Sequence, residues 1–173
     1  MQPRCIILRN MTRSDDTKIQ WTNDETAAWT GLVRSGQNLL QSVETALKER
    51  GLPPLTWYDV LWELEKARPT GLRLHDLGSR VLLDKYNVTR LVTRLEKEGL
   101  ARRMNCPGDG RGIVALITAK GVRLRKRMWP VYSRAVRDGF FSRLSPRETA
   151  SLKKLLGRVS GGAAESKPTA KSD

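Results

Sequence analysis

The chain has 173 residues, a formal net charge of +14, one histidine and two cysteines. This length suits one domain or a small two-lobed subunit with its own apolar core. Cys5 and Cys106 lie far apart and neither belongs to a CxxC pair, so we expect neither a disulfide scaffold nor a zinc site. The excess of basic residues favours a polyanionic partner, either nucleic acid or an acidic membrane surface.

The two ends of the chain lack the periodicity of packed elements. Residues 1–21 are predicted to form a flexible extension, within which Met11 could also be the start of translation. The apolar run at the N-terminus is too short for a signal peptide, and no stretch approaches a membrane span. Residues 160–173 predict a disordered tail. We therefore expect a soluble, cytoplasmic protein.

A long helix is predicted over residues 22–50. Thr22 and Glu25 have the spacing of a capping box, and apolar residues then recur at helical intervals. Gly51 follows its last residue, as expected for the end of a helix.

Two shorter helices are predicted next. Thr56 and Asp59 have the capping pattern that begins a helix, and Pro69 closes this segment. A third, short helix is predicted from about Leu74 to Val81.

A fourth helix and a hairpin follow. Asp84 can cap the helix, and Gly99 suits the left-handed conformation at its end. Residues Ile113–Ile117 form the best strand in the chain, and Arg102–Asn105 would pair with it across a tip at Cys106–Gly112. The apolar stripe of the fourth helix comprises Val88, Leu91, Val92 and Leu95.

Two helices complete the pattern. Thr118 can cap a fifth helix that runs from Ala119 to about Arg143. Ser145 and Glu148 then have the capping-box spacing that begins a sixth helix.

In this order the elements resemble the MarR family of winged helix-turn-helix regulators. The resemblance covers about residues 25–159 and is carried by three motifs: VTRLVTRLEKEGLARR from Val88, DGR at Asp109–Arg111, and ALITAKG from Ala115. It implies a mainly α fold with a small β-hairpin wing and a helical dimerisation region. The implied organisation has dimerisation helices at 22–50 and 119–159 and a winged helix DNA-binding lobe at 56–118, within a domain spanning 22–159.

The face of the fourth helix opposite its apolar stripe carries short polar side chains and basic side chains. Asn87 can pair with an adenine edge, and arginine can bind guanine through two hydrogen bonds. Arg90 and Arg94 are four residues apart and share a face. The alternative is a solvated basic surface beside Glu96 and Glu98. The candidate DNA-contacting residues of this helix are Lys85, Tyr86, Asn87, Thr89, Arg90 and Arg94.

The wing supplies a second candidate contact. At a hairpin tip, Arg111 can enter a narrow minor groove, where the negative potential is enhanced. The resemblance implies that Asp109 orients it through an ion pair; the alternative is an ordinary loop ion pair, which contributes ~0–1 kcal/mol to stability. Cys106 is either a redox-sensitive thiol at the wing or a plain exposed cysteine. The basic residues expected to be phosphate partners, or simply surface charges, are Arg102, Arg103, Arg123 and Arg127.

The chain departs from the family pattern at three of these positions. Lys85 and Tyr86 stand where small residues are commoner in the family, and Gly110 stands where a basic residue is usual. The specificity of the helix and the charge of the wing tip are therefore expected to differ from the family norm.

Four aromatic residues offer two interpretations. In the family, small aromatic acids bind between the DNA-binding lobe and the dimer helices, which implies a possible ligand pocket. The alternative is ordinary core packing. The four residues are Trp29, Trp57, Tyr58 and Trp62.

These patterns favour a homodimeric, sequence-specific regulator, a ligand-responsive repressor on a pseudopalindromic operator in double-stranded DNA. The alternative is a weakly specific chromosome-associated DNA-binding protein. No enzyme is expected, because no nucleophile–base pair or paired carboxylates form a recognisable motif, and no cofactor or metal is implied. The residues expected at the dimer interface include Leu32, Leu39, Val43, Phe140, Phe141, Leu152 and Leu155.

Overall fold

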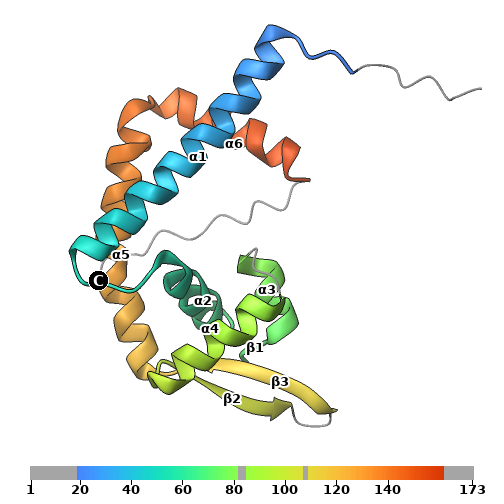
Figure 1. The fold of residues 1–173 in the computed structure, drawn as a ribbon, viewed down its shortest axis with the longest axis vertical. Coiled ribbons are helices and arrows are strands. Elements are labelled where there is room, and N and C mark those ends of the chain that lie inside the picture. Colours follow the sequence, from blue (N-terminus) through green and yellow to red (C-terminus); the bar gives the residue numbers. More distant parts are fainter. Residues whose placement is uncertain (1–18, 82–84, 107–108, 162–173) are drawn as a thin grey trace, which may run out of the picture. The chain divides into compact units, whose positions relative to one another are not determined.

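The computed structural model describes residues 19–81, 85–106 and 109–161, with only the backbone described at 85, 86, 106 and 109–111 (Figure 1). The chain divides into two compact units, one up to Ser35 and one from Gly36. In chain order the elements are α1 (Asn23–Glu49), α2 (Leu55–Lys66), β1 (Leu72–Arg73), α3 (Leu74–Val81), α4 (Lys85–Lys97), β2 (Ala101–Cys106), β3 (Asp109–Ile117), α5 (Ala119–Gly139), the 3-10 helix η1 (Phe141–Arg143) and α6 (Pro146–Val159).

The start of α1 confirms the predicted capping box. The hydroxyl of Thr22 accepts a hydrogen bond from the backbone N–H of Glu25 at 3.1 Å, and the Glu25 carboxylate accepts from the backbone N–H of Thr22 at 2.8 Å. These hydrogen bonds from Thr22 hold the pKa of Glu25 below its usual value. Within the first unit, Trp21 and Trp29 meet edge to face, with ring centroids 6.3 Å apart.

The start of α2 differs from the prediction. The helix begins at Leu55, directly after Pro54, and neither Thr56 nor Asp59 caps it. Instead, the carboxylate of Glu44, from α1, accepts a hydrogen bond from the backbone N–H of Leu55 at 3.1 Å. A carboxylate brought by a neighbouring helix satisfies the same unpaired donor that a local cap would satisfy.

The hairpin register is as predicted, but the sheet is larger. Arg102 pairs with Leu116, and Asn105 pairs with Ile113. The register shifts between Asn105 and Cys106, and Cys106 then pairs with Asp109, so the tip is shorter than expected. A third strand, β1, was not predicted; it pairs with β3 and gives the antiparallel order β1-β3-β2.

The winged lobe has one continuous core. Helix α3 contacts both α2 and α4, all three helices contact the sheet, and the β2–β3 hairpin projects as the wing (Figure 1). The predicted stripe of α4 is buried in this core, as are Leu61 and Leu64 of α2 and Ala115 and Ile117 of β3. This burial fixes which face of α4 remains outside.

A second core joins the winged lobe to the long helices. Val43 and Leu47 of α1 pack with Leu55 and Tyr58 of α2 and with Met128 of α5. Val43 is only 1% exposed, so the expectation that it lies at a dimer interface is wrong. Its apolar surface is already covered within the protomer.

The last helices follow their predicted caps. The Thr118 hydroxyl accepts from the backbone N–H of Gly121 at 3.1 Å, and Ser145 and Glu148 form the capping box of α6. However, α5 ends at Gly139 and η1 follows, where one helix to about Arg143 was expected. Among the described residues, no helix combines the length and apolar character needed to cross a membrane.

Candidate nucleic-acid interface

Helix α4 has a buried face and an outer face. Val88, Leu91, Val92 and Leu95 are at most 9% exposed, which removes this stripe from solvent. Asn87, Thr89, Arg90 and Arg94, all predicted DNA contacts, are exposed on the remaining surface. The alternation follows from the 3.6-residue period of a helix whose apolar positions pack on α2, α3 and the sheet.

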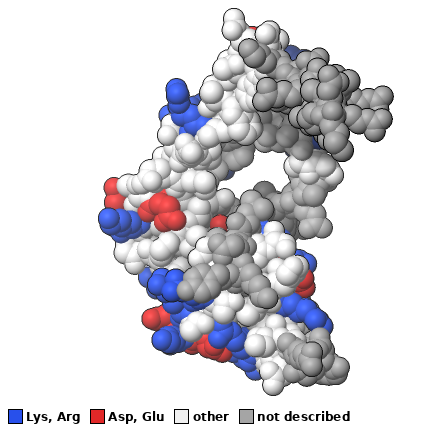
Figure 2. Space-filling model, turned by 45° about the vertical axis from the view of Figure 1, so that its right-hand side comes forward, with Lys and Arg blue, Asp and Glu red and all other residues white. Residues whose placement is uncertain are grey.

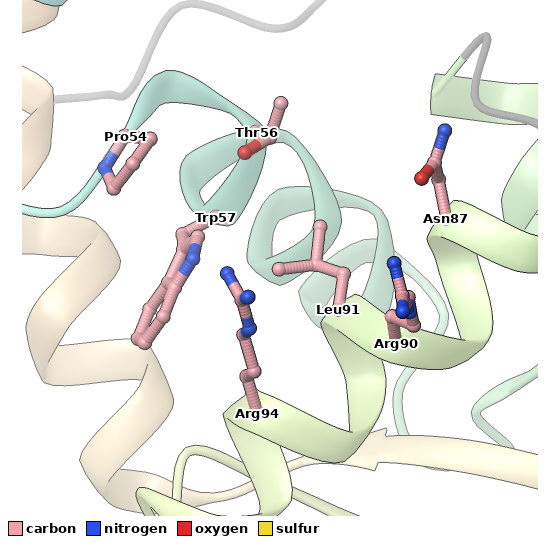
Figure 3. A pocket seen from close by; sticks show the side chains of 7 residues that line it. All are labelled: Pro54, Thr56, Trp57, Asn87, Arg90, Leu91 and Arg94. Carbon is pink, nitrogen blue, oxygen red and sulfur yellow. The ribbon is translucent and has the colours of Figure 1, made fainter.

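Three of these residues line one groove of about 370 Å³ (Figure 3). Asn87, Arg90 and Arg94 come from α4, and Pro54, Thr56 and Trp57 come from the beginning of α2. Figure 3 shows the Arg94 guanidinium pointing across the groove toward the Trp57 indole. The groove thus combines an amide, two guanidinium groups, a hydroxyl and an aromatic ring, which suits a polyanionic partner with flat apolar edges.

Trp57 and Thr56 were not predicted to belong to this surface. The sequence predicts either a ligand pocket or ordinary core packing for Trp57, and the partly buried Trp57 does pack against the core of the winged lobe. Its remaining edge borders the groove because α2 begins beside α4. The only sequence signal was the position of both residues in the first turn of a helix, which often approaches DNA phosphates.

Several predicted residues lie outside what the structure describes. Asp84 falls in a gap, and the side chains of Lys85 and Tyr86 are not described. The same holds for Cys106 and for Asp109 and Arg111 at the wing, whose backbone belongs to the β2–β3 hairpin. Their roles therefore stay predictions.

Arg103 was expected to contact phosphate or to be a plain surface charge, but its side chain is directed to α4. Its Nη2 donates to the Thr93 hydroxyl at 2.7 Å and to the Thr89 carbonyl at 3.0 Å. A guanidinium held in this way joins the wing to α4.

Three of the four candidate aromatic pocket residues belong to the second unit, and they do not line one site. Tyr58 is 1% exposed and stacks on Tyr132, with ring centroids 4.9 Å apart, and on Trp62 at 6.4 Å. Trp57 instead borders the α4 groove. Trp29 belongs to the first unit, where it contacts Trp21.

A buried charge accompanies this aromatic cluster. Arg125 of α5 is 7% exposed, pairs with Glu65 of α2, and lies 4.8 Å from the centre of the Trp62 ring. Burial raises the pKa of Tyr58 to about 12, although a hydrogen bond from Arg125 acts in the opposite direction. The cluster therefore stabilises the junction of α2 and α5.

The surface of the winged lobe is basic. On the face shown in Figure 2, Lys and Arg side chains gather over the lower part of the molecule, interspersed with Asp and Glu. Among the described residues, no group of His, Cys, Asp and Glu could hold a metal ion.

Comparison with known proteins identifies the family. Residues 50–112 match the profile of the MarR family. The uncharacterized HTH-type transcriptional regulator YkoM of Bacillus subtilis (strain 168) is 36% identical over 109 residues, which are 63% of this chain and 68% of that protein. The chain belongs to the MarR family. It is therefore a DNA-binding transcriptional regulator with a winged helix-turn-helix, and the resemblance seen in its motifs is confirmed.

Two solved structures of the family are informative. Sco3205 from Streptomyces coelicolor, crystallised in complex with DNA, is 28% identical, with a TM-score of 0.77 over 88% of this chain and 96% of that one. CouR from Rhodococcus jostii RHA1, bound to p-coumaroyl-CoA, is 25% identical, with a TM-score of 0.66 over 76% of this chain and 90% of that one. The predicted fold class, mainly α with a small β wing, is confirmed.

Proposed function

We propose that this MarR-family protein is a homodimeric repressor that binds a pseudopalindromic operator and releases it when a small ligand binds. The observation that carries the proposal is the groove formed by Asn87, Arg90 and Arg94 with the first turn of α2. These side chains have the donors that recognise adenine and guanine edges in the major groove. The DNA complex of Sco3205 supports the same use of the fold.

In this proposal α4 enters the major groove, and the wing carries Arg111 to the adjacent minor groove. Lys85, Tyr86 and Thr89 contribute further contacts from α4, and Asp109 orients Arg111. Contacts to phosphates would set the position of the protein on the duplex, whereas contacts to base edges would set its preference among sequences.

The dimer is proposed to bury apolar side chains that the protomer leaves exposed. On α6, Leu155, Leu156 and Val159 are 54%, 41% and 83% exposed. Leu32 of α1 is 48% exposed, and Phe141 of η1 is 47% exposed. A two-fold axis would place the two recognition helices ~34–36 Å apart, one turn of DNA.

The domain organisation predicted from the sequence is proposed unchanged. Residues 22–50 and 119–159 would form the dimerisation region and 56–118 the DNA-binding lobe, flanked by an extension at 1–21 and a tail at 160–173. The buried residues of the core of the winged lobe all lie between Val60 and Ile117, which supports this division.

Ligand response is proposed because CouR was solved with p-coumaroyl-CoA. A small aromatic ligand beside Trp62 would meet a buried indole N–H that has no hydrogen-bond partner among the described residues. It would also lie at the junction of α2 and α5, where Arg125 pairs with Glu65. A change at this junction would alter the placement of the winged lobe.

Selection of bound duplexes from random DNA by the full-length protein, with sedimentation of the complex, tests the function. We expect enrichment of an inverted repeat bound by two protomers. Enrichment of no sequence would indicate the weakly specific, chromosome-associated alternative, and a monomeric complex would contradict the dimer.

A further inference from the structure

A second groove, of about 540 Å³, lies on the other side of Trp57. Its floor is apolar and comprises Trp57, Leu100 and Leu124, with Pro53 at the edge. Its rim is cationic and comes from the first turns of α5. The rim residues are Lys120, Arg123 and Arg127.

The charges of this rim form a stripe. Lys120, Arg123 and Arg127 recur at intervals of three and four residues, so they lie along one face of α5. All three are exposed, and neither arginine forms an ion pair with any residue that the structure describes. Glu98 is the one carboxylate among the lining residues, so the groove keeps an excess of positive charge.

The groove is tied closely to the recognition helix. Lys120 Nζ donates to the carbonyl of Glu98 at 2.7 Å, and the Thr118 hydroxyl donates to the carbonyl of Gly99 at 2.8 Å. A Cβ on Gly121 would lie 2.2 Å from the carbonyl oxygen of Leu100. The start of α5 therefore packs without a gap against the turn that ends α4.

Trp57 connects the two grooves. Its indole lines the groove that holds Arg90 and Arg94 as well as the groove that holds Arg123 and Arg127. Figure 3 shows α5 beside Trp57, on the side away from α4. These cations come from α4 and α5 and lie on both sides of the Trp57 ring. Such an arrangement suits a single extended polyanion better than two separate small ligands.

We propose that Arg123 and Arg127 bind backbone phosphates of the same duplex that α4 recognises, and so extend the DNA contact along α5. This inference rests on the proposed function of α4. The contacts are independent of sequence, because phosphates carry no base information. They add counterion release, which steepens the dependence of affinity on salt.

The test is the slope of log affinity against log salt concentration for the full-length protein and its Arg123→Gln/Arg127→Gln variant. The dimer would lose four phosphate contacts, two from each protomer, so the magnitude of the slope should fall by about 3.6. Affinity should fall by the same factor for the selected operator and for an unrelated duplex. The Arg123→Lys/Arg127→Lys variant retains the charges and should restore the slope.

The Lys153→Gln/Lys154→Gln variant is the matched control, because it removes the same charge from exposed positions on α6. Its salt slope should equal that of the wild type. If the slope falls equally in this variant and in Arg123→Gln/Arg127→Gln, the effect reflects net charge and contradicts a phosphate contact at Arg123 and Arg127. Thermal melting of each variant establishes that it is folded.

An unchanged slope in the Arg123→Gln/Arg127→Gln variant would overturn the inference. If Arg94→Ala still weakens operator binding in that case, the proposed function stands without this contact. Titration with 4-hydroxybenzoate tests the alternative that the groove binds a small anion. This alternative holds if the wild type binds 4-hydroxybenzoate, the double variant does not, and the two proteins have the same salt slope for DNA. If the wild type prefers no sequence, the proposed function fails, but the inference can still be tested. The salt slopes of the wild type and the double variant on the unrelated duplex then decide it, because phosphate contacts do not depend on sequence.

Discussion

Arg103 of β2 and Glu96 of α4 form an ion pair, with 3.1 Å between Arg103 Nη1 and Glu96 Oε2. The other carboxylate oxygen of Glu96 accepts a hydrogen bond from the backbone N–H of Arg103 at 3.0 Å. Together with the bonds to Thr89 and Thr93, the pair joins the base of the wing to the middle of the recognition helix. The two proposed DNA-contacting elements are therefore held in one geometry.

The first prediction concerns this connection. Replacing Arg103 by Met should lower the free energy of unfolding by about 1–3 kcal/mol, because it removes hydrogen bonds to a charged group. It should also weaken the preference for A·T pairs beside each half-site, because the wing would no longer be placed precisely enough for minor-groove contact. Urea denaturation and binding to duplexes with altered flanks measure the two effects.

The neighbouring arginine provides the control. Arg102 is exposed on the same strand, and Arg102→Met should leave both quantities nearly unchanged. If Arg103→Met instead reduces the salt slope while stability and flank preference stay as in the wild type, Arg103 is a phosphate contact and the positioning role is wrong.

The second prediction separates the recognition helix from the wing. Arg94→Ala should lose about 1–3 kcal/mol of discrimination at one base pair of each half-site, because a base-edge contact is removed. Arg111→Ala should leave that discrimination intact and weaken the preference in the flanks. Competition binding with single-pair operator variants measures both. Loss of the same preferences in the two variants would show that they do not contact separate grooves.

The third prediction concerns the packing of α5 against the end of α4. Gly121→Ala places a Cβ against the Leu100 carbonyl and should cost about 1–3 kcal/mol of stability, because the backbone there must shift. Gly157→Ala, in α6, meets nothing within 4 Å and should stabilise the protein by up to about 1 kcal/mol. Thermal melting of both variants checks the contrast. An unchanged melting temperature in Gly121→Ala would contradict the close packing of Gly121 against the Leu100 carbonyl.

The fourth prediction is a dependence of stability on pH. Because burial raises the pKa of Tyr58 from 10.0 to about 12, the unfolded chain releases this proton at lower pH than the folded chain. The stability that the neutral phenol contributes is therefore present below pH 10 and is lost as pH rises from 10 to 12. Tm measured across this range should fall less steeply in Tyr58→Phe. Equal slopes in the two proteins would contradict the raised pKa.

Local patterns in the sequence predicted most of the fold. The α4 stripe, the left-handed Gly99 and the register of Arg102 with Leu116 each depend on neighbouring residues, and all three are found. The two-residue strand β1 was missed because it is too short to show alternation, and only its pairing with β3 defines it. The end of α5 was placed too late because apolar residues continue past Gly139.

Contacts between distant residues were beyond prediction. Nothing in the order of residues indicated that Glu44 would cap α2 or that Arg103 would bind α4, since each contact requires the folded arrangement. For Trp57 the sequence predicts either a ligand pocket or core packing, and it packs partly against the core of the winged lobe. Its second role, as the wall between two basic grooves, depends on how α2 lies beside α4 and α5.

The central claim is that α4 recognises bases in the major groove. Methylation protection on the selected operator tests it most directly, because dimethyl sulfate modifies guanine N7 in the major groove and adenine N3 in the minor groove. We predict protected guanines in two half-sites about one helical turn apart, with the protection at one guanine of each half-site lost in Arg94→Ala. Protection confined to adenine N3, or guanine protection that Arg94→Ala leaves unchanged, would contradict the claim.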